Sequence, residues 1–201
     1  YLHFHPGKKA ATLMTVHNLA FQGIFPSGSV TQLGLPLESF DINGVEYYAN
    51  MSFLKGGLYY ADHITTVSPN YAKEIQTESL GFGLQGLLAA RHRHLTGIIN
   101  GIDTREWDPA TDPHLVKNYT SKKISDKAAN KSALQQQMGL AIEADIPLFG
   151  VVSRLNHQKG TDLLIQIASQ LVKIPAQLVV LGSDHADLEH QLSTLTQSYP
   201  D

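Results

Sequence analysis

The chain has 201 residues, and 42% of them are hydrophobic, which is enough apolar material for one large domain or two small ones. Its 15 basic and 18 acidic residues are mixed along the chain and give a net charge of −3, so the basic surface typical of duplex-binding proteins is not expected. No apolar run reaches the roughly 18 residues that a membrane helix needs, so neither nucleic acid nor a membrane is an expected partner.

The two ends of the chain and its lack of cysteine indicate what kind of protein it comes from. It begins at Tyr1 instead of a methionine and stops at Asp201, shortly after a predicted helix. We therefore expect a piece of a longer protein, and the missing signal or transit peptide is uninformative about targeting. The absence of cysteine fits a reducing compartment.

The first hundred residues predict strands that alternate with helices. Short apolar and β-branched runs such as 11–17 are typical of strands buried on both faces of a parallel sheet. Ser68 before Pro69 predicts a helix start, because serine caps free N–H groups and proline fits the first turn. The predicted strands are 11–17, 62–67 and 95–99, and the predicted helices are 46–61 and 68–76.

The second half predicts the same alternation after a polar connection. Residues 103–125 carry two prolines and little apolar periodicity, so a domain boundary is expected near 100–115. Strands alternating with helices predict an α/β fold with parallel sheets and right-handed crossovers, divided into two units. The predicted elements here are helix 127–140, strand 147–152, helix 161–172 capped by Thr161, strand 177–181 and helix 186–198.

The strongest local signal for chemistry is a pair of cations between the strand 147–152 and the helix that begins at Thr161. Arg154 and Lys159 lie five residues apart in this short connection. Ligands of open α/β sheets bind beyond the carboxyl ends of strands, and a helix N-terminus offers free N–H groups to an anion. Arginine can grip two phosphate oxygens and lysine adds a compact charge, so the pattern indicates a diphosphate site that needs no metal. From spacing alone, the alternative is a pair of solvated loop cations.

Other patterns are interpreted as structural. Gly81, Gly83 and Gly86 spell G-x-G-x-x-G, but the polar, helix-like residues before them are not the strand that a dinucleotide-binding turn requires. The histidine pairs His3/His5 and His92/His94 lack a third ligand at a fixed spacing, so no metal site is expected. Tyrosines within 46–61 are expected to pack rather than bind sugar. Three aspartates at loop or strand ends are interpreted as turn or capping residues, not nucleophiles: Asp41, Asp62 and Asp103.

The segment Ser153-Arg-Leu-Asn-His-Gln-Lys-Gly160 closely resembles the corresponding segment of bacterial glycogen synthases and plant starch synthases. Further segments resemble the same family in the same order along nearly the whole chain, and the likeness weakens at 182–185. The family has the two-domain glycosyltransferase-B fold, in which Rossmann-like domains face a cleft. The resembling segments are 15–23, 53–62, 67–72, 86–88, 99–103, 130–131 and 153–160.

The resemblance implies a division of the chain and a set of site residues. Residues 1–100 would be the C-terminal part of the acceptor-side domain, and 101–201 the interdomain connection with the first part of the nucleotide-sugar-binding domain. Arg154 and Lys159 would hold the diphosphate of ADP-glucose and stabilise charge on the departing ADP, and His17 would lie beside the transferred glucose. Substrate binding is expected of Asn18, Gly23, Asn100 and Ser153.

The implied reaction is retaining transfer of glucose from ADP-glucose to the non-reducing end of an α-1,4-glucan. Such a transfer builds positive charge on the sugar and negative charge on the leaving phosphate, and the family implies front-face transfer assisted by that phosphate. No cofactor and no metal are expected, and the chain by itself is expected to be inactive. The alternatives are a UDP-sugar transferase and an inactive glucan-binding homologue. The expected location is cytoplasmic for a bacterial protein and the plastid for a plant homologue.

Overall fold

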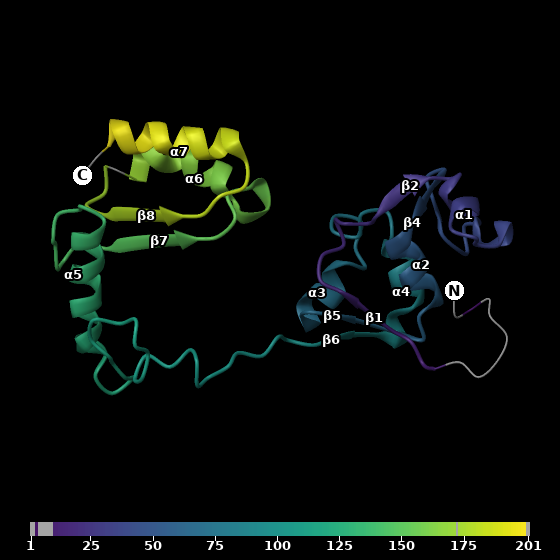
Figure 1. Cartoon of the computed structure of the whole chain (residues 1–201), viewed down its shortest axis with the longest axis horizontal. Helices are drawn as coiled ribbons and strands as arrows, with labels where there is room; N and C mark the ends of the chain where they lie inside the picture. Colours follow the sequence, from purple (N-terminus) through teal and green to yellow (C-terminus); the bar gives the residue numbers. More distant parts are fainter. Residues whose placement is uncertain (1–2, 4–9, 172, 200–201) are drawn as a thin grey trace. The chain divides into compact units, whose positions relative to one another are not determined.

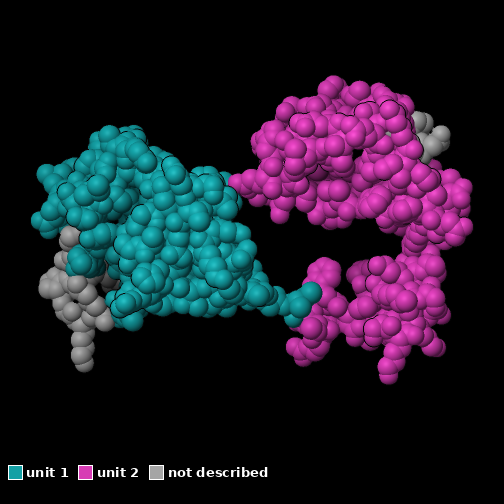
Figure 2. All heavy atoms as spheres, turned by 180° about the vertical axis from the view of Figure 1, so that it is seen from behind, with its two compact units in different colours: residues 1–102 teal, residues 103–201 magenta. Residues whose placement is uncertain are grey.

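A computed structural model describes residues 3, 10–171 and 173–199 of the chain. The chain divides into two compact units, residues 1–102 and 103–201, which Figure 2 colours separately. Over the part of the chain that the structure describes, unit 1 contains two small sheets and unit 2 contains one, and helices pack beside them (Figure 1). Among the described residues, no helix combines the length and the apolar character needed to cross a membrane.

The main sheet of unit 1 is parallel. Its strands β1 (Leu13–Val16), β5 (His63–Thr66) and β6 (Leu95–Gly97) are arranged in the order β1-β5-β6. Val16 pairs with Thr66, and Thr66 with Gly97, so all three strands end at the same edge. The predicted strands and the predicted α/β class with parallel sheets are confirmed.

The helices of unit 1 surround a core of aliphatic side chains, and Leu58 and Leu88 are fully buried in it. Helix α3 begins as predicted, because the Ser68 hydroxyl oxygen accepts hydrogen bonds from the amides of Asn70 and Tyr71 and Pro69 occupies the first turn. The helices of this unit are α1 (Ser29–Gln32), α2 (Phe53–Tyr60), α3 (Pro69–Glu74) and α4 (Gln85–Ala90), with single 3₁₀ turns at Leu37–Ser39 and His92–His94.

The helix predicted over 46–61 is wrong in its first half. There the chain forms an antiparallel sheet of β2 (Ile24–Pro26), β4 (Asn50–Ser52) and β3 (Glu46–Tyr47), and α2 follows directly. Tyr48 and Ala49 both have positive φ, which turns the chain between β3 and β4, and the hydroxyl oxygen of Ser52 caps α2 by accepting from Lys55 N. The apolar spacing was compatible with one helix, but the turn and the cap divide it.

Unit 2 contains a two-stranded parallel sheet of β7 (Leu148–Val152) and β8 (Gln177–Leu181). Helices α6 (Thr161–Leu171) and α7 (Ala186–Ser198) lie on the same side of this sheet (Figure 1). Both strands and both helices agree with their predictions within the described residues. The remaining helix is α5 (Lys127–Gln137), and 3₁₀ turns lie at Ile124–Asp126 and His157–Lys159.

Helix α5 ties the polar connection to the sheet of unit 2. The side-chain amide of Asn130 accepts from Lys117 N at 3.1 Å and donates to Lys117 O at 2.7 Å. It thus satisfies both backbone groups of Lys117, as a paired strand would, and fixes the connection at this residue. On the sheet side, the buried Gln135 donates to Gln177 Oε1 at 2.6 Å. Gln177 Nε2 in turn donates to the carbonyl of Ala141 at 2.8 Å. The connection is thus held by specific polar contacts despite its lack of regular structure.

Candidate functional site: the loop between β7 and α6

The two predicted phosphate-binding cations lie in one short loop at the carboxyl end of β7. Arg154 and Lys159 are both exposed, whereas Leu155 and Asn156 between them are only 4% and 7% exposed. The buried pair anchors the loop, so the two cationic side chains extend from a fixed backbone. Ser153, the third predicted residue here, donates from its hydroxyl to the carbonyl of Arg154 at 3.1 Å.

The loop ends in a tight turn that starts α6. Gly160 has φ of +72°, a left-handed conformation that favours glycine, and its carbonyl accepts the first helical bond from Leu164 N at 3.0 Å. Helix α6 therefore begins directly beyond Lys159, and its first amide groups and positive dipole end lie next to that cation.

The predicted capping role of Thr161 is wrong. Thr161 is the first residue of the helix, only 3% exposed, and its hydroxyl oxygen has no hydrogen-bond partner. The chain enters the helix through Gly160 instead, which leaves the threonine inside the first turn. The carboxylate of the next residue, Asp162, lies 3.4 Å from His157 Nδ1.

A second loop, between β8 and α7, lies against the first. Ser153 N donates to the carbonyl of Leu181 at 3.1 Å, and Leu155 N donates to that of Ser183 at 3.1 Å. The close approach requires glycine at position 182, because a Cβ there would lie 1.9 Å from the carbonyl oxygen of Ser153. The second loop therefore supports the backbone of the first.

Asn156 connects these two loops, and the sequence reasoning missed it. Its side-chain oxygen accepts from Lys159 N at 3.2 Å, and its Nδ2 donates to Asp184 Oδ2 at 2.7 Å. The local signal was available, since asparagine three residues before Lys159 is a common capping residue. The partnership with Asp184 spans 28 residues and needed the fold.

The arrangement can bind an anion. Two exposed cations, the first turn of a helix and a fixed backbone are features that hold phosphate groups in α/β proteins. Arginine supplies a planar fork and lysine a point charge, so together they fit two neighbouring phosphates better than one carboxylate.

The predicted sugar-side residues lie in unit 1, at the carboxyl edge of its parallel sheet. His17 directly follows β1, and Asn100 follows β6 by three residues; both are exposed. Because the strands are parallel, these two side chains share an edge although 83 positions separate them in the chain.

The loop after β1 is well fixed. Asn18 Oδ1 accepts from Ala20 N at 2.9 Å, and Leu19 N donates to the hydroxyl oxygen of Tyr71 at 2.9 Å. Gly23 has φ of +58° and its carbonyl accepts from Phe53 N at 3.1 Å. The side chain of Asn18 and the backbone of Gly23 thus shape this loop, which presents His17 at its start.

Asp41 and Asp103 are turn residues as expected, whereas Asp62 is not, because its partner Thr12 lies 50 residues away in the chain. Asp41 Oδ1 accepts from Asn43 N, and Asp103 Oδ1 accepts from Arg105 N, each at 2.9 Å. Asp62 accepts from both the amide and the hydroxyl of Thr12, at 2.7 and 2.8 Å. The backbone hydrogen bond from Thr12, followed by the side-chain one, lowers the pKa of the Asp62 carboxyl below its ordinary value.

Unit 1 also buries a lysine. Lys55, in the first turn of α2, is 8% exposed and donates from Nζ to the carbonyls of Ile42, at 2.8 Å, and of Glu46. The carboxylate of Glu46 lies 4.0 Å from the same nitrogen. Burial lowers the pKa of the Lys55 ammonium below its ordinary value, and the charges of Glu46 and Asp41 partly offset this effect. Its partners are loop carbonyls, so its role is to hold the segment before α2.

The dinucleotide-binding alternative is not supported. The residues directly before Gly81 form turns beyond α3 and no strand, and Gly83 adopts its positive φ against the tyrosines at 47 and 48. Those tyrosines pack edge-to-face at 4.7 Å, as do Tyr59 and Tyr60 at 5.0 Å. Within the described residues, no three histidine, aspartate or glutamate side chains gather as metal ligands; His5 of the first histidine pair lies outside them.

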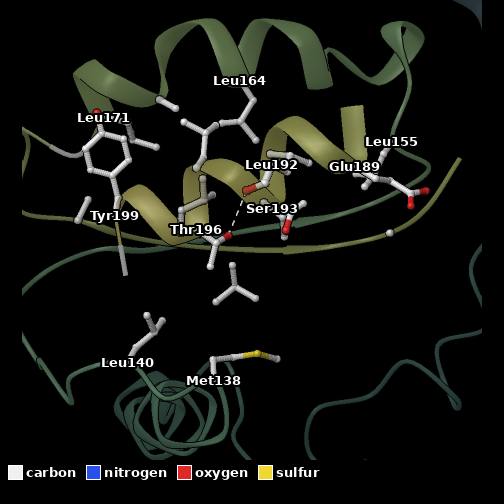
Figure 3. A pocket seen from close by; sticks show the side chains of 17 residues that line it. Met138, Leu140, Leu155, Leu164, Leu171, Glu189, Leu192, Ser193, Thr196 and Tyr199 are labelled. Atoms are coloured by element: carbon white, nitrogen blue, oxygen red, sulfur yellow. Dashed lines mark hydrogen bonds between the residues drawn. The ribbon is translucent and has the colours of Figure 1, made fainter. Parts of the chain in front are cut away.

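A hollow in unit 2 is separate from the cationic pair. A cavity of about 470 Å³ lies between α6, α7 and β8, and Figure 3 shows Leu164 and Leu171 of α6 with Leu192 of α7 among its lining side chains. Met138 and Leu140 complete it, and neither Arg154 nor Lys159 contributes. Most of its lining side chains are aliphatic, so this hollow offers no cationic group to a diphosphate.

Comparisons with known proteins agree on one family. The model for the starch synthase catalytic domain matches residues 1–90. Over 200 residues, the chain is 65% identical to a glycogen synthase of Nitrosomonas eutropha and 60% identical to one of Nitrosospira multiformis, covering all of this chain and 40% of each relative. A solved structure, the catalytic domain of starch synthase IV from Arabidopsis thaliana bound to ADP and acarbose, matches with a TM-score of 0.84 and 31% identity. That match covers 94% of this chain and 39% of the other.

These matches confirm the predicted likeness and the glycosyltransferase-B class of fold. The chain spans about 40% of the length of the curated relatives it matches.

Proposed function

We propose that the chain belongs to the family of bacterial glycogen synthases and plant starch synthases, and that the protein containing it transfers glucose from ADP-glucose to the non-reducing end of an α-1,4-glucan. The observation that carries this proposal is the cationic loop, in which Arg154 and Lys159 flank a buried anchor at the start of α6. The ADP bound to the starch synthase IV structure supports a nucleotide as ligand, and its acarbose supports a glucan.

In the proposed reaction the loop receives the diphosphate of the donor. The guanidinium of Arg154 donates two hydrogen bonds to phosphate oxygens, and the ammonium of Lys159 adds a second charge. As the bond to glucose breaks, negative charge grows on the leaving phosphate, and cations fixed in advance stabilise that charge more than they stabilise the ground state. The loop therefore raises the rate of transfer as well as the affinity for donor.

On the sugar side, we assign His17 and Asn100 to the glucose that is transferred, because both stand at the carboxyl edge of the unit 1 sheet. Asn18, Gly23 and Ser153 contribute to substrate binding by shaping their loops. In this division, unit 1 is the acceptor-side domain and unit 2 the beginning of the nucleotide-sugar-binding domain. The reaction needs no metal, since the two cations balance the diphosphate, and the cytoplasm is the proposed location.

The test uses the full-length protein. Release of ADP from ADP-glucose should require glucan, and Arg154→Ala or Lys159→Ala should lower turnover by about 100-fold or more. The matched controls are Arg105→Ala and Lys122→Ala, two exposed cations of the polar connection. Normal turnover in both loop variants would remove the basis of the proposal. Preference for UDP-glucose would correct the donor, and glucan binding without turnover would identify an inactive homologue.

A further inference from the structure

Asn156 lies between Arg154 and Lys159 in the cationic loop, and its side chain is turned into the protein. It is 7% exposed, and both ends of its side-chain amide are engaged, one by Lys159 N at 3.2 Å and one by Asp184 at 2.7 Å. A buried amide with both ends satisfied has a single orientation, because turning it over would oppose two oxygens at one end and two N–H groups at the other. The side chain is therefore a rigid strut between the backbone of Lys159 and the loop before α7.

Asp184 is fixed in turn. Its backbone N–H donates to Glu189 Oε1 at 2.8 Å, and Leu155 forms an isolated parallel bridge with it. The amide of the next residue, His185, donates to the carbonyl of Leu155 at 3.2 Å. The carboxylate of Asp184 thus has a fixed base although its side chain is exposed.

From this geometry, and resting on the proposed function, we infer that Asn156 is a positioning residue for donor binding. Held by Asp184, it fixes the backbone at Lys159 and so aims the ammonium at the diphosphate. Lysine has a long flexible stem, so its aim depends on where its backbone is held, and small displacements of charged groups in a binding site weaken both affinity and rate.

The exposed partner allows a test that leaves the buried one intact. Asp184→Ala removes the acceptor of Asn156, whereas Asp184→Asn keeps a side-chain oxygen in its place. Both variants remove one negative charge near the loop, which by itself would tighten the binding of an anion. Loss of the strut predicts the opposite effect for alanine alone, so the two explanations differ in sign.

The measurements are the Kd of ADP, the KM values for ADP-glucose and glucan, and the thermal midpoint, all in the full-length protein. We expect Asp184→Ala to weaken ADP binding and raise the KM for ADP-glucose by about tenfold, with the KM for glucan unchanged. Asp184→Asn should bind ADP as well as the wild type or better.

Two results separate this inference from the proposed function. If Arg154→Ala abolishes ADP binding while Asp184→Ala binds ADP as tightly as Asp184→Asn, the strut is purely structural and the inference is wrong. If the wild type itself fails to bind ADP, the proposed function fails first. A lower thermal midpoint in Asp184→Ala with unchanged ADP affinity also counts against the inference.

Discussion

Replacing Lys55 by methionine should loosen one segment of unit 1 while leaving its sheet intact. Methionine keeps most of the buried stem but removes the ammonium that donates to the carbonyls of Ile42 and Glu46. Hydrogen bonds from a charged donor contribute about 1.5–3 kcal/mol each, and two that share one donor do not add fully, so we expect a loss of about 2–4 kcal/mol.

The effect should be local, so amide hydrogen exchange in the full-length protein is the suitable assay. The amides of Val45 and Ser52 are bonded to the carbonyls of Ser39 and Val45, at 2.9 and 2.8 Å, within the segment that Lys55 holds. At about 1.4 kcal/mol for each factor of ten, their protection should fall by about 30- to 700-fold.

The matched control is Lys73→Met, which alters an exposed lysine in α3 of the same unit and should leave those amides unchanged. Exchange in β5 should also stay as in the wild type, because its bonds belong to the parallel sheet. Unchanged protection of Val45 and Ser52 in Lys55→Met would refute the reasoning and show that water replaces the ammonium without cost.

Two further predictions concern packing and pH. Gly182→Ala should destabilise unit 2 by about 1–3 kcal/mol, because the new Cβ would lie 1.9 Å from the carbonyl oxygen of Ser153. The control is Gly150→Ala, whose new Cβ has no atom within 4 Å. Thermal unfolding of both variants checks this prediction, and equal midpoints would contradict it. Because the pKa of Asp62 is lowered in the folded protein, the ionised carboxyl stabilises the fold at pH values above its ordinary pKa of 3.8. This contribution is lost as the pH falls through the folded-state pKa. The stability difference between wild type and Asp62→Asn should therefore shrink on acidification below that value, and a difference independent of pH would count against the assignment.

The elements that were predictable from the sequence share a dominant local signal. Strand 177–181 contains the apolar run 178–181 between Pro175 and Gly182, and its predicted limits agree with β8. The Ser68-Pro69 start of α3 depends only on neighbouring residues. The prediction of one helix over 46–61 was wrong because apolar residues follow a helical spacing on both sides of the turn at Tyr48 and Ala49. Both residues have positive φ, which tyrosine and alanine normally avoid, so their residue types did not indicate a turn.

The candidate site shows the same division. Arg154 and Lys159 were found because strand, loop and helix follow one another within a dozen residues. The partnership of Asn156 with Asp184 could not be found, because it joins two loops that meet only when β7 and β8 pair in parallel. Thr161 was misassigned for a related reason, since a threonine and a preceding glycine compete for the start of a helix and the backbone of Gly160 decides the outcome.

The two units differ in how many apolar side chains are buried among their described residues. The buried core of unit 1 joins residues from the parallel sheet and from helices α2 and α4, together with Ile75 at the end of α3 and Leu84 before α4. Among the described residues of unit 2, the buried apolar side chains are Leu155, Ala168 and Leu188, and Val152 remains 79% exposed. The cationic loop stands on this unit, where buried Leu155 anchors it and Asn156 ties its backbone to Asp184 in the loop before α7. The glycogen synthases that this chain matches are about two and a half times as long as the chain. Binding of the proposed donor should therefore be measured in the full-length protein.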